Sequence, residues 1–362
     1  MSDRELQKTA DYWDDRRSAG SNARAQWWDL RPINEYRNRL LSGDSAIDFE
    51  AYATSQYFDE SGARWRVLSL GCGTGKLERR LAELGVVGSG LGVDIGTEGL
   101  KYAQALATEQ GYTTLNYEYA DLNSATLEPN GFDAVFAAGI VHHLSNLEHV
   151  FTQVAAALKP GGWFFLDEYI GPNRFQFPRK QRVLVDLAFQ LIPQRYRTLR
   201  PATRASADAA ARHSAIPLHA LHPRLLFPKI RGGKLLDAVK YRLSLLRANS
   251  GGASAQPVLE KPRFPTAADV AAGDPSEAVR SEEIVARLKE HFEIVEMKGT
   301  GLSILQFLLA DIAGNFRAEN AETTELLGML ISIESALIAS GELAHDFAFI
   351  AARPRSDLNT SP

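Results

Sequence analysis

Apolar and polar residues are patterned along the middle of the chain so that short apolar runs alternate with amphipathic segments. The apolar runs predict strands at 66–70, 88–94, 115–120, 132–138 and 163–166. Apolar residues at helical spacing predict helices between them, at 75–84, 97–110 and 147–158. Such alternation predicts an α/β fold, a Rossmann-like doubly wound and mostly parallel sheet.

The same pattern divides the chain into segments. Polar and aromatic residues 1–60 predict a helical N-terminal cap, and 61–171 form the Rossmann-like core. In 172–280 the alternation stops, and this basic, proline-rich stretch predicts a large, mainly helical insertion or lid. Helices at 281–292 and 322–340 and strands at 293–298 and 345–352 predict that 281–353 complete the core sheet. Residues 354–362 are expected to be a disordered tail. The apolar tracts 304–309 and 326–337 are compatible with a core or with an oligomer interface, so the oligomeric state stays open.

Composition narrows the class of protein. The chain has 362 residues, 45% of them hydrophobic and 23% charged, which is typical of a globular protein. A single cysteine excludes a disulfide within the chain and fits a reducing compartment. The N-terminus does not resemble a secretory signal, and no run approaches the roughly 18 apolar residues of a membrane span. We therefore expect a cytoplasmic protein.

A glycine-rich turn follows the first predicted strand. The segment 67–75 reads VLSLGCGTG, and Asp94 ends the second strand 19 residues after Gly75. Glycines let the backbone turn tightly and approach a ligand, and an acid at this place can accept hydrogen bonds from ribose hydroxyls. A dinucleotide fingerprint would need a third glycine where Lys76 stands. The pattern therefore indicates a nucleoside cofactor without a pyrophosphate.

Six motifs in order resemble the class I S-adenosylmethionine-dependent methyltransferases, in particular their small-molecule branch of sugar and natural-product O-methyltransferases. They are LGCGTG at 70–75, VD at 93–94, ADL at 120–122, FDAV at 132–135, VHHL at 141–144 and LKPGG at 158–162. The resemblance is close over 67–166 and looser over the C-terminal strands. It implies a class I methyltransferase fold and S-adenosylmethionine as cofactor.

The resemblance also implies a place for each part of the cofactor. The backbone of Gly71, Cys72, Gly73 and Gly75 would pass beneath its methionine and ribose portions. The adenosine would be held by Asp94 at the ribose, Ile95 at the adenine face, Asp121 at the adenine amino group and Leu122 beside the ring. Ala138 and Gly139 would lie near the sulfonium. One position departs from the family pattern, because Ser69 stands where an acid is usual. We interpret Cys72 as a packing residue rather than a nucleophile.

Methyl transfer to a hydroxyl needs a base, and histidine has a suitable pKa. The catalytic candidates are His142 and His143, after the fourth strand, and Glu168, after the fifth. Either histidine could instead pack or cap the following helix. Substrate contacts are expected near the cap and after the fifth strand, and the alternative for the cap residues is ordinary packing. The candidates are Tyr12, Trp13, Asn22, Trp27, Tyr169, Asn173 and Arg174. We assign no metal site.

Residues 172–250 carry 16 Lys and Arg against three acids, so this block has a charge of about +13 within a chain of net charge −4. Its segment 234–248 predicts a basic amphipathic helix. Such a helix could cover its own domain, contact an anionic membrane surface as a peripheral protein, or bind an anionic substrate. The scattered arginines and the lack of a recognised RNA module argue against nucleic acid.

The sequence thus predicts transfer of a methyl group from S-adenosylmethionine to a small-molecule or lipid-linked acceptor, at oxygen. The alternatives are N-methylation and a non-catalytic S-adenosylmethionine-binding protein. The acceptor itself cannot be read from the sequence, because variable caps and lids determine it in this superfold.

Overall fold

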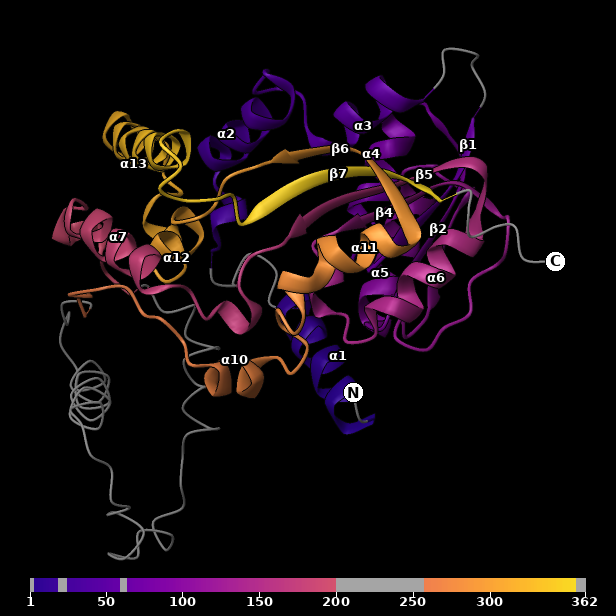
Figure 1. Ribbon diagram of the computed structural model, residues 1–362, viewed down its shortest axis with the longest axis horizontal. Coiled ribbons are helices and arrows are strands. Elements are labelled where there is room, and N and C mark those ends of the chain that lie inside the picture. Colours follow the sequence, from indigo (N-terminus) through magenta and orange to yellow (C-terminus); the bar gives the residue numbers. More distant parts are fainter. Residues whose placement is uncertain (1–2, 19–24, 59–63, 200–256, 356–362) are drawn as a thin grey trace, which may run out of the picture.

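A computed structural model describes residues 3–18, 25–58, 64–199 and 257–355. Asn22, the helix expected at 234–248 and the tail expected at 354–362, except for its first two residues, lie outside these described ranges. Seven strands form one sheet in the order β3-β2-β1-β4-β5-β7-β6 (Figure 1). Their bounds are β1 Trp65–Leu70, β2 Val87–Asp94, β3 Leu115–Tyr119, β4 Phe132–Ala138, β5 Leu158–Tyr169, β6 Phe292–Gly299 and β7 Phe347–Pro354.

The sheet is parallel except at β7. β1 pairs in parallel with β2 on one side and with β4 on the other. β2 also pairs in parallel with β3, and β4 with β5. β7 lies between β5 and β6 and is antiparallel to both. The predicted Rossmann-like, mostly parallel fold is therefore confirmed.

Helices cover both faces of this sheet (Figure 1). One face packs on α6 and α11, and its core includes Phe151, Leu288 and the strand residue Phe164. The other face packs on α3 and α4, with Phe49 and Leu81 against Phe165. The bounds of these and the adjoining helix are α3 Phe49–Tyr57, α4 Lys76–Glu83, α5 Thr97–Glu109, α6 Leu147–Ala157 and α11 Ile284–His291. Their apolar stripes match the predicted helical spacing, since burial of these stripes is what holds them on the sheet.

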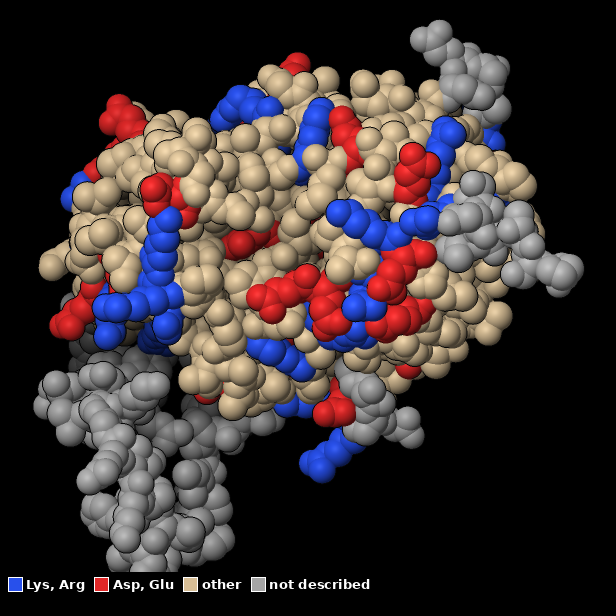
Figure 2. All heavy atoms as spheres, in the orientation of Figure 1, with Lys and Arg blue, Asp and Glu red and all other residues tan. Residues whose placement is uncertain are grey.

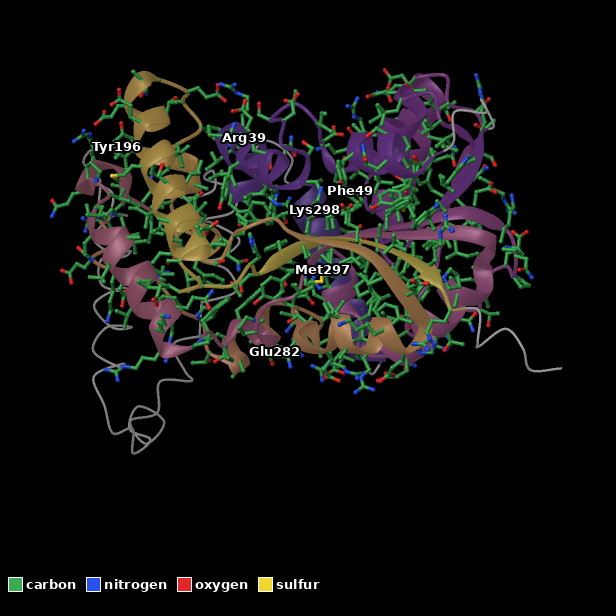
Figure 3. The ribbon with its side chains drawn as sticks, turned by 45° about the horizontal axis from the view of Figure 1, so that its top comes forward. Arg39, Phe49, Tyr196, Glu282, Met297 and Lys298 are labelled. Carbon is green, nitrogen blue, oxygen red and sulfur yellow. The ribbon has the colours of Figure 1, made fainter. Side chains whose placement is uncertain are left out.

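A separate helical cluster lies beyond the end of the sheet where β6 ends and β7 begins (Figures 1 and 3). It joins the N-terminal segment, part of the region after β5 and the segment between β6 and β7, and its core contains Ile33, Phe189, Leu308 and Leu327. Its helices are α2 Arg31–Ser42, α7 Arg179–Gln190, α12 Leu305–Leu309 and α13 Ala321–Ala339. The tract 304–309 is thus buried core. Residues 300–346 lie in this cluster rather than in the sheet that we expected 281–353 to complete.

The turn predicted at 159–162 lies inside β5, which begins earlier than expected, at Leu158. The pairing of β4 with β5 is irregular there, because Phe132 opposes Leu158 while Ala134 opposes Trp163. The extra residues form a bulge at the Lys-Pro-Gly-Gly turn, with Gly161 in the left-handed region at φ 80°. The strand and the turn are therefore continuous rather than separate.

Charges of both signs alternate over the face of α6 and α11 (Figure 2). Arg280 bridges Glu148 and Glu283, each at 2.7 Å, and Arg287 pairs with Glu290. None of the described helices combines the length and apolar character that a membrane crossing requires.

Candidate functional site

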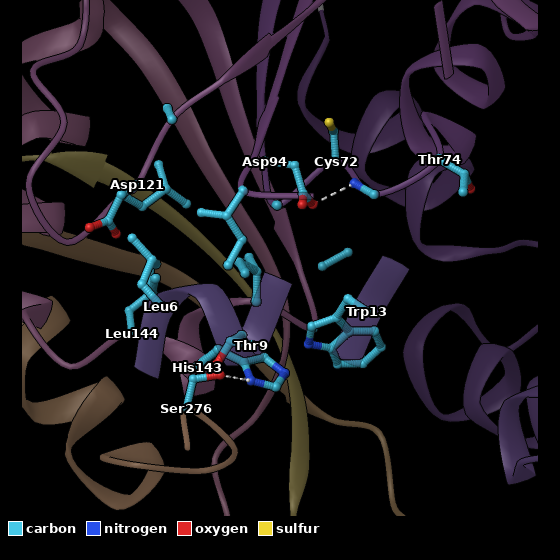
Figure 4. Close-up of a pocket in the computed structure, with 18 of the residues that line it drawn as sticks. Leu6, Thr9, Trp13, Cys72, Thr74, Asp94, Asp121, His143, Leu144 and Ser276 are labelled. Carbon is cyan, nitrogen blue, oxygen red and sulfur yellow. Dashed lines mark hydrogen bonds between the residues drawn. The ribbon is translucent and has the colours of Figure 1, made fainter. Parts of the chain in front are cut away.

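A cavity of about 480 Å³ opens at the carboxyl ends of β1 to β4, where ligands bind in open parallel sheets (Figure 4). Its volume lies within the range of small-molecule sites. Nine of the ten predicted cofactor positions line it: Gly71, Cys72, Gly73, Asp94, Ile95, Asp121, Leu122, Ala138 and Gly139. The tenth, Gly75, does not.

Two glycines of the turn after β1 cannot be replaced without strain. Gly71 has φ 62°, and a Cβ there would collide with the side chain of Ile140. Gly75 has φ 71° and begins α4, where a Cβ would lie 2.5 Å from the Tyr117 hydroxyl. Both positions require the left-handed backbone that glycine adopts freely. Gly71 therefore lies in the cavity wall, whereas Gly75 lies outside it, against Tyr117.

Asp94 at the tip of β2 ties this turn to the next strand. One carboxylate oxygen accepts from Gly73 N at 2.8 Å and the other from Gly96 N at 2.7 Å. The side chain is buried but reaches the cavity wall. Each carboxylate oxygen can accept more than one hydrogen bond, so these two backbone contacts do not by themselves use all the acceptor sites of a carboxylate.

Asp121 after β3 is fixed by its own loop. Its Oδ1 accepts from the backbone of Asn123 at 3.0 Å and from that amide side chain at 3.1 Å. Asn123 in turn accepts from Ser145 N at 2.8 Å. This loop therefore joins β3 to the turn after the two histidines, and both Asp121 and Asn123 line the cavity.

A carboxyl group lies close to the serine that departs from the family pattern. Ser69 is buried, and Glu78 of α4 is fully buried near it, with neither carboxyl oxygen in full hydrogen-bond geometry with a described group. A Cβ on Gly92 would lie 2.8 Å from Glu78 Oε1. Burial raises the pKa of Glu78 to about 7, with the Ser69 hydroxyl opposing the rise. α4 thus places an acid behind the glycine turn.

We expect Glu78→Gln to stabilise the protein more as the pH rises. A carboxyl with a raised folded-state pKa binds its proton more tightly in the fold, so wild-type stability falls between pH 4.5 and 7. The neutral amide avoids this loss, which is worth about 3 kcal/mol at pH 8. Urea unfolding at pH 5 and pH 8 measures the difference. Glu83→Gln, at the exposed end of the same helix, is the control, and a stability gain that does not grow with pH would contradict the prediction.

His142 and Glu168 form a buried pair beside the cavity rather than in its wall. His142 Nδ1 is hydrogen-bonded to Glu168 Oε1, and His142 Nε2 lies 3.3 Å from Glu277 Oε1. Glu168 is fully buried, and it also accepts from three backbone N–H groups, those of Ile140, Val141 and Tyr169. Burial by itself lowers the pKa of His142, but Glu168 and Glu277 outweigh it and raise the pKa to about 10. His142 is therefore a cation held between two carboxylates.

His143 has the opposite character. It is buried, lines the cavity, and lies with its ring centroid 4.2 Å from that of His142. Burial lowers its pKa below the usual 6.5, and the positive charge of His142 lowers it further. Its Nδ1 lies 2.9 Å from Ser276 Oγ (Figure 4). At neutral pH His143 is therefore an uncharged imidazole at the wall of the cavity, which a general base requires.

Three of these side chains could also hold a metal ion. One ligand atom each of His142, His143 and Glu277 lies within 4.8 Å of the others. However, both ring nitrogens of His142 already face carboxylates, and its pKa of about 10 keeps a proton where a metal would need a lone pair. The arrangement suits a proton better than a metal.

The predicted substrate contacts separate into two groups. Trp13 lines the cavity. The Tyr12 ring packs edge-on against the Trp13 ring, with centroids 5.3 Å apart. The others lie away from the cavity. Trp27 packs in the helical cluster, Tyr169 is buried with its hydroxyl donating to Pro172 O at 2.9 Å, and Asn173 and Arg174 bind the segment 277–282. Of the candidates within the described ranges, only Trp13 of α1, which spans Asp3–Ser18, lines the cavity.

Sequence reasoning missed further residues of the cavity wall. They come mainly from α1, from the segment before α2, from the loops next to the motifs and from two places far along the chain: Leu6, Thr9, Trp28, Asp29, Thr74, Ala120, Asn123, Ile140, Leu144, Ser276 and Arg317. The neighbours of known motifs could have been included by adjacency. No sequence signal marks Ser276 or Arg317, because tertiary folding alone brings them here.

The part of the chain that bears the cavity matches a known protein family. Residues 68–166 match the family model described as "Methyltransferase domain". These residues run from β1 to β5 and include each of the strands that bear the cavity. Residues 68–166 are therefore similar to a methyltransferase domain.

Relatives of the methyltransferase domain carry the name ubiquinone biosynthesis O-methyltransferase. That of Colwellia psychrerythraea is 31% identical over 149 residues, which are 39% of this chain and 58% of the relative. That of Leptothrix cholodnii is 35% identical over 102 residues, which are 28% of this chain and 43% of the relative. The chain thus spans about half the length of these relatives.

Solved structures overlap the methyltransferase domain and parts around it. An S-adenosylmethionine-dependent methyltransferase from Mesorhizobium loti has a TM-score of 0.40 and 16% identity, over 84% of this chain and 97% of that one. Phosphoethanolamine N-methyltransferase 2 of Haemonchus contortus, in complex with S-adenosyl-L-methionine, has a TM-score of 0.41 and 16% identity over 84% of this chain and 52% of that one.

The residues of the cavity fit S-adenosylmethionine, the cofactor that the sequence motifs imply. Asp94 and Asp121 offer acceptors at the ends of β2 and β3, as an adenosine needs. Gly71 lines the cavity, and its left-handed backbone, at φ 62°, is one that glycine adopts freely. The site therefore offers acceptor groups that a nucleoside cofactor could use.

Proposed function

We propose that this protein transfers a methyl group from S-adenosylmethionine to an oxygen of a small-molecule acceptor, with His143 as general base. The observation that carries the proposal is an uncharged histidine in the wall of the cavity that the predicted cofactor residues line. The shared name of the relatives supports oxygen as the nucleophile and a lipid-linked acceptor.

The chain contributes positioning and one proton transfer. Asp94 and Asp121 would hold the adenosine, and the backbone of Gly71 and Gly73 would hold the methionine portion. When bound, the cofactor would supply a methyl group from its sulfonium centre, and transfer of that group leaves a neutral thioether. His143 takes the proton of the acceptor hydroxyl as the new O–C bond forms, so that no free alkoxide is needed. Alignment of the acceptor in the cavity supplies much of the rate.

Incubation of the purified protein with metabolite and lipid extracts and methyl-labelled S-adenosylmethionine tests this function. Mass spectrometry is expected to find a labelled methyl ether. A labelled amine would indicate N-methylation instead. Cofactor binding without any labelled product would indicate a non-catalytic binding protein and overturn the proposal.

We expect Asp94→Ala to weaken S-adenosylmethionine binding by about 10- to 100-fold, which corresponds to the loss of one hydrogen bond to a charged acceptor, about 1.5–3 kcal/mol. The substitution also frees Gly73 N and Gly96 N, so the turn loses its tie to β2. Titration calorimetry measures the affinity. Glu98→Ala is the control, since this exposed residue of α5 pairs with Lys101 outside the cavity. Equal affinities in wild type and Asp94→Ala would contradict the assignment.

A further inference from the structure

Asp274 is a buried carboxylate that connects three parts of the chain behind His143. It follows α10, which spans Ala267–Gly273, and only 3% of its surface is exposed. Oδ1 accepts from Ser276 N at 2.8 Å, from Ser276 Oγ at 2.7 Å and from Thr9 Oγ1 at 2.9 Å. Oδ2 accepts from Trp13 Nε1 at 3.1 Å and lies 3.6 Å from His143 Nδ1. Asp274 has no part in the methyl transfer proposed above.

The direction of these hydrogen bonds fixes the tautomer of His143. Ser276 has a single hydroxyl proton, and a carboxylate can only accept, so this proton points to Asp274. Ser276 Oγ must therefore accept from His143 Nδ1 across the 2.9 Å contact. With its proton on Nδ1, neutral His143 carries its lone pair on Nε2. The nitrogen left to take a proton is thus Nε2.

Asp274 also connects this tautomer to the N-terminal helix. Thr9 and Trp13 of α1 both donate to it, and both line the cavity. The Trp13 ring packs edge-on against His143 with centroids 5.5 Å apart, as Figure 4 shows beside the Ser276 contact. α1 therefore contributes to the cavity wall and to the support of the histidine at the same time.

We propose that Asp274 is a positioning residue that, through Ser276, keeps His143 in the tautomer with a basic Nε2, and that docking of α1 through Thr9 and Trp13 holds Asp274 in place. This proposal rests on the proposed function, since it concerns the base of that reaction. It gives α1 a role beyond covering the cavity. The base is fully oriented only when α1 and the segment after α10 are both in position.

The charged groups around His143 determine what removal of Asp274 does. His142 lies next to it in the chain, Glu168 faces it from β5, and Asp274 and Glu277 face it from the segment after α10. The charge of Asp274 raises the pKa of His143 against the lowering by burial and His142. Asp274→Asn should therefore lower this pKa further, and Ser276→Ala, which removes no charge, should move it much less.

The tautomer can be measured without an acceptor substrate. In the full-length protein with ¹⁵N-labelled histidine, long-range ¹H–¹⁵N correlations report which ring nitrogen carries the proton, and a His143→Gln spectrum assigns the signals. We expect wild-type His143 at pH 7.5 to be protonated at Nδ1. Ser276→Ala is expected to yield a mixture with the Nε2–H form, and Ser276→Thr, which keeps the hydroxyl, to restore the wild-type spectrum. A wild-type signal with the proton on Nε2, or an unchanged tautomer in Ser276→Ala, would overturn the proposal even if the protein methylates its acceptor.

Thr9→Val separates the contribution of α1 from that of the 274–276 segment, because it removes one donor to Asp274 and keeps the shape of the side chain. We expect a partial shift toward the Nε2–H form. Gln7→Ala is the matched control on the same helix, since Gln7 donates to Asp11 on its exposed side. A shift in both variants would mean that α1 acts only through helix stability, and no shift in Thr9→Val would remove α1 from the proposal.

Kinetics then connect the tautomer to the reaction. We expect Ser276→Ala to lower kcat by about 10-fold or more with little change in the KM for S-adenosylmethionine, because a misprotonated base cannot take the acceptor proton. In Asp274→Asn the acid limb of the kcat profile should also move to lower pH. A loss of folded protein alone would lower both variants without moving the limb. Absence of all methyl transfer in wild type would count against the proposed function and leave the spectroscopic result to decide the tautomer.

Discussion

We expect His143→Gln to lower kcat by about 10²- to 10⁴-fold and to leave the affinity for S-adenosylmethionine nearly unchanged, because general base catalysis contributes on this order. His143 lines the cavity, and burial followed by the charge of His142 lowers its pKa below 6.5. The neutral form is the base, so activity falls only when the pH drops below that lowered pKa. Wild-type kcat should therefore be level from pH 8 to 6.5 and fall below it. Steady-state kinetics across this range and titration calorimetry measure the two quantities.

His142→Gln is the informative comparison, because it removes the neighbouring ring without removing the base. His142 is already protonated at neutral pH and lies outside the cavity wall, so it cannot accept the proton. Loss of its charge should raise the pKa of His143 and move the acid limb to higher pH. Unchanged turnover in His143→Gln, or a greater loss of turnover per folded molecule in His142→Gln, would contradict the assignment of His143.

The fold and the cofactor positions could be predicted because local signals determine them. The apolar runs of β1, β2 and β4 are buried on both faces and so read directly from the sequence. The glycine turn and Asp94 sit at fixed places in one βαβ unit, and nine of the ten positions indeed line the cavity. Local pattern and global fold agree in this region.

The roles of the two histidines could not be separated from the sequence, because they depend on residues 26 to 135 positions away. Glu168 and Glu277 make His142 a cation, whereas Ser276 and Asp274 orient His143. Trp27 was predicted for the cavity, but the turn before α2 points it into the helical cluster and places Trp28 in the wall instead. A one-residue difference in such a turn exchanges the inner and outer side chains, and no periodicity specifies it.

A large loss of stability is expected when Glu168, which binds His142 and three backbone N–H groups, is replaced. We expect Glu168→Ala to lower the free energy of unfolding by about 3–5 kcal/mol, as when one partner of a buried ion pair is removed. It leaves the His142 cation without its closest counter-charge and three backbone N–H groups, at 140, 141 and 169, without their acceptor. Urea unfolding at pH 7.5 measures the change. Glu148→Gln is the control, because its ion pair with Arg280 lies at the surface and is partly exposed, and surface pairs contribute about 1 kcal/mol or less.

A double-mutant cycle separates the contribution of the His142–Glu168 ion pair from that of the backbone hydrogen bonds to Glu168. Glu168→Gln keeps one oxygen for the backbone N–H groups but loses the charge, and His142→Gln removes the cation. If the two groups stabilise each other as ions, the double variant should be more stable than the sum of the single losses by about 1–3 kcal/mol. Additive losses would mean that Glu168 acts through the backbone alone. In that case His142 would not be held as a cation by Glu168, and the low pKa that makes His143 a base would lose one of its causes.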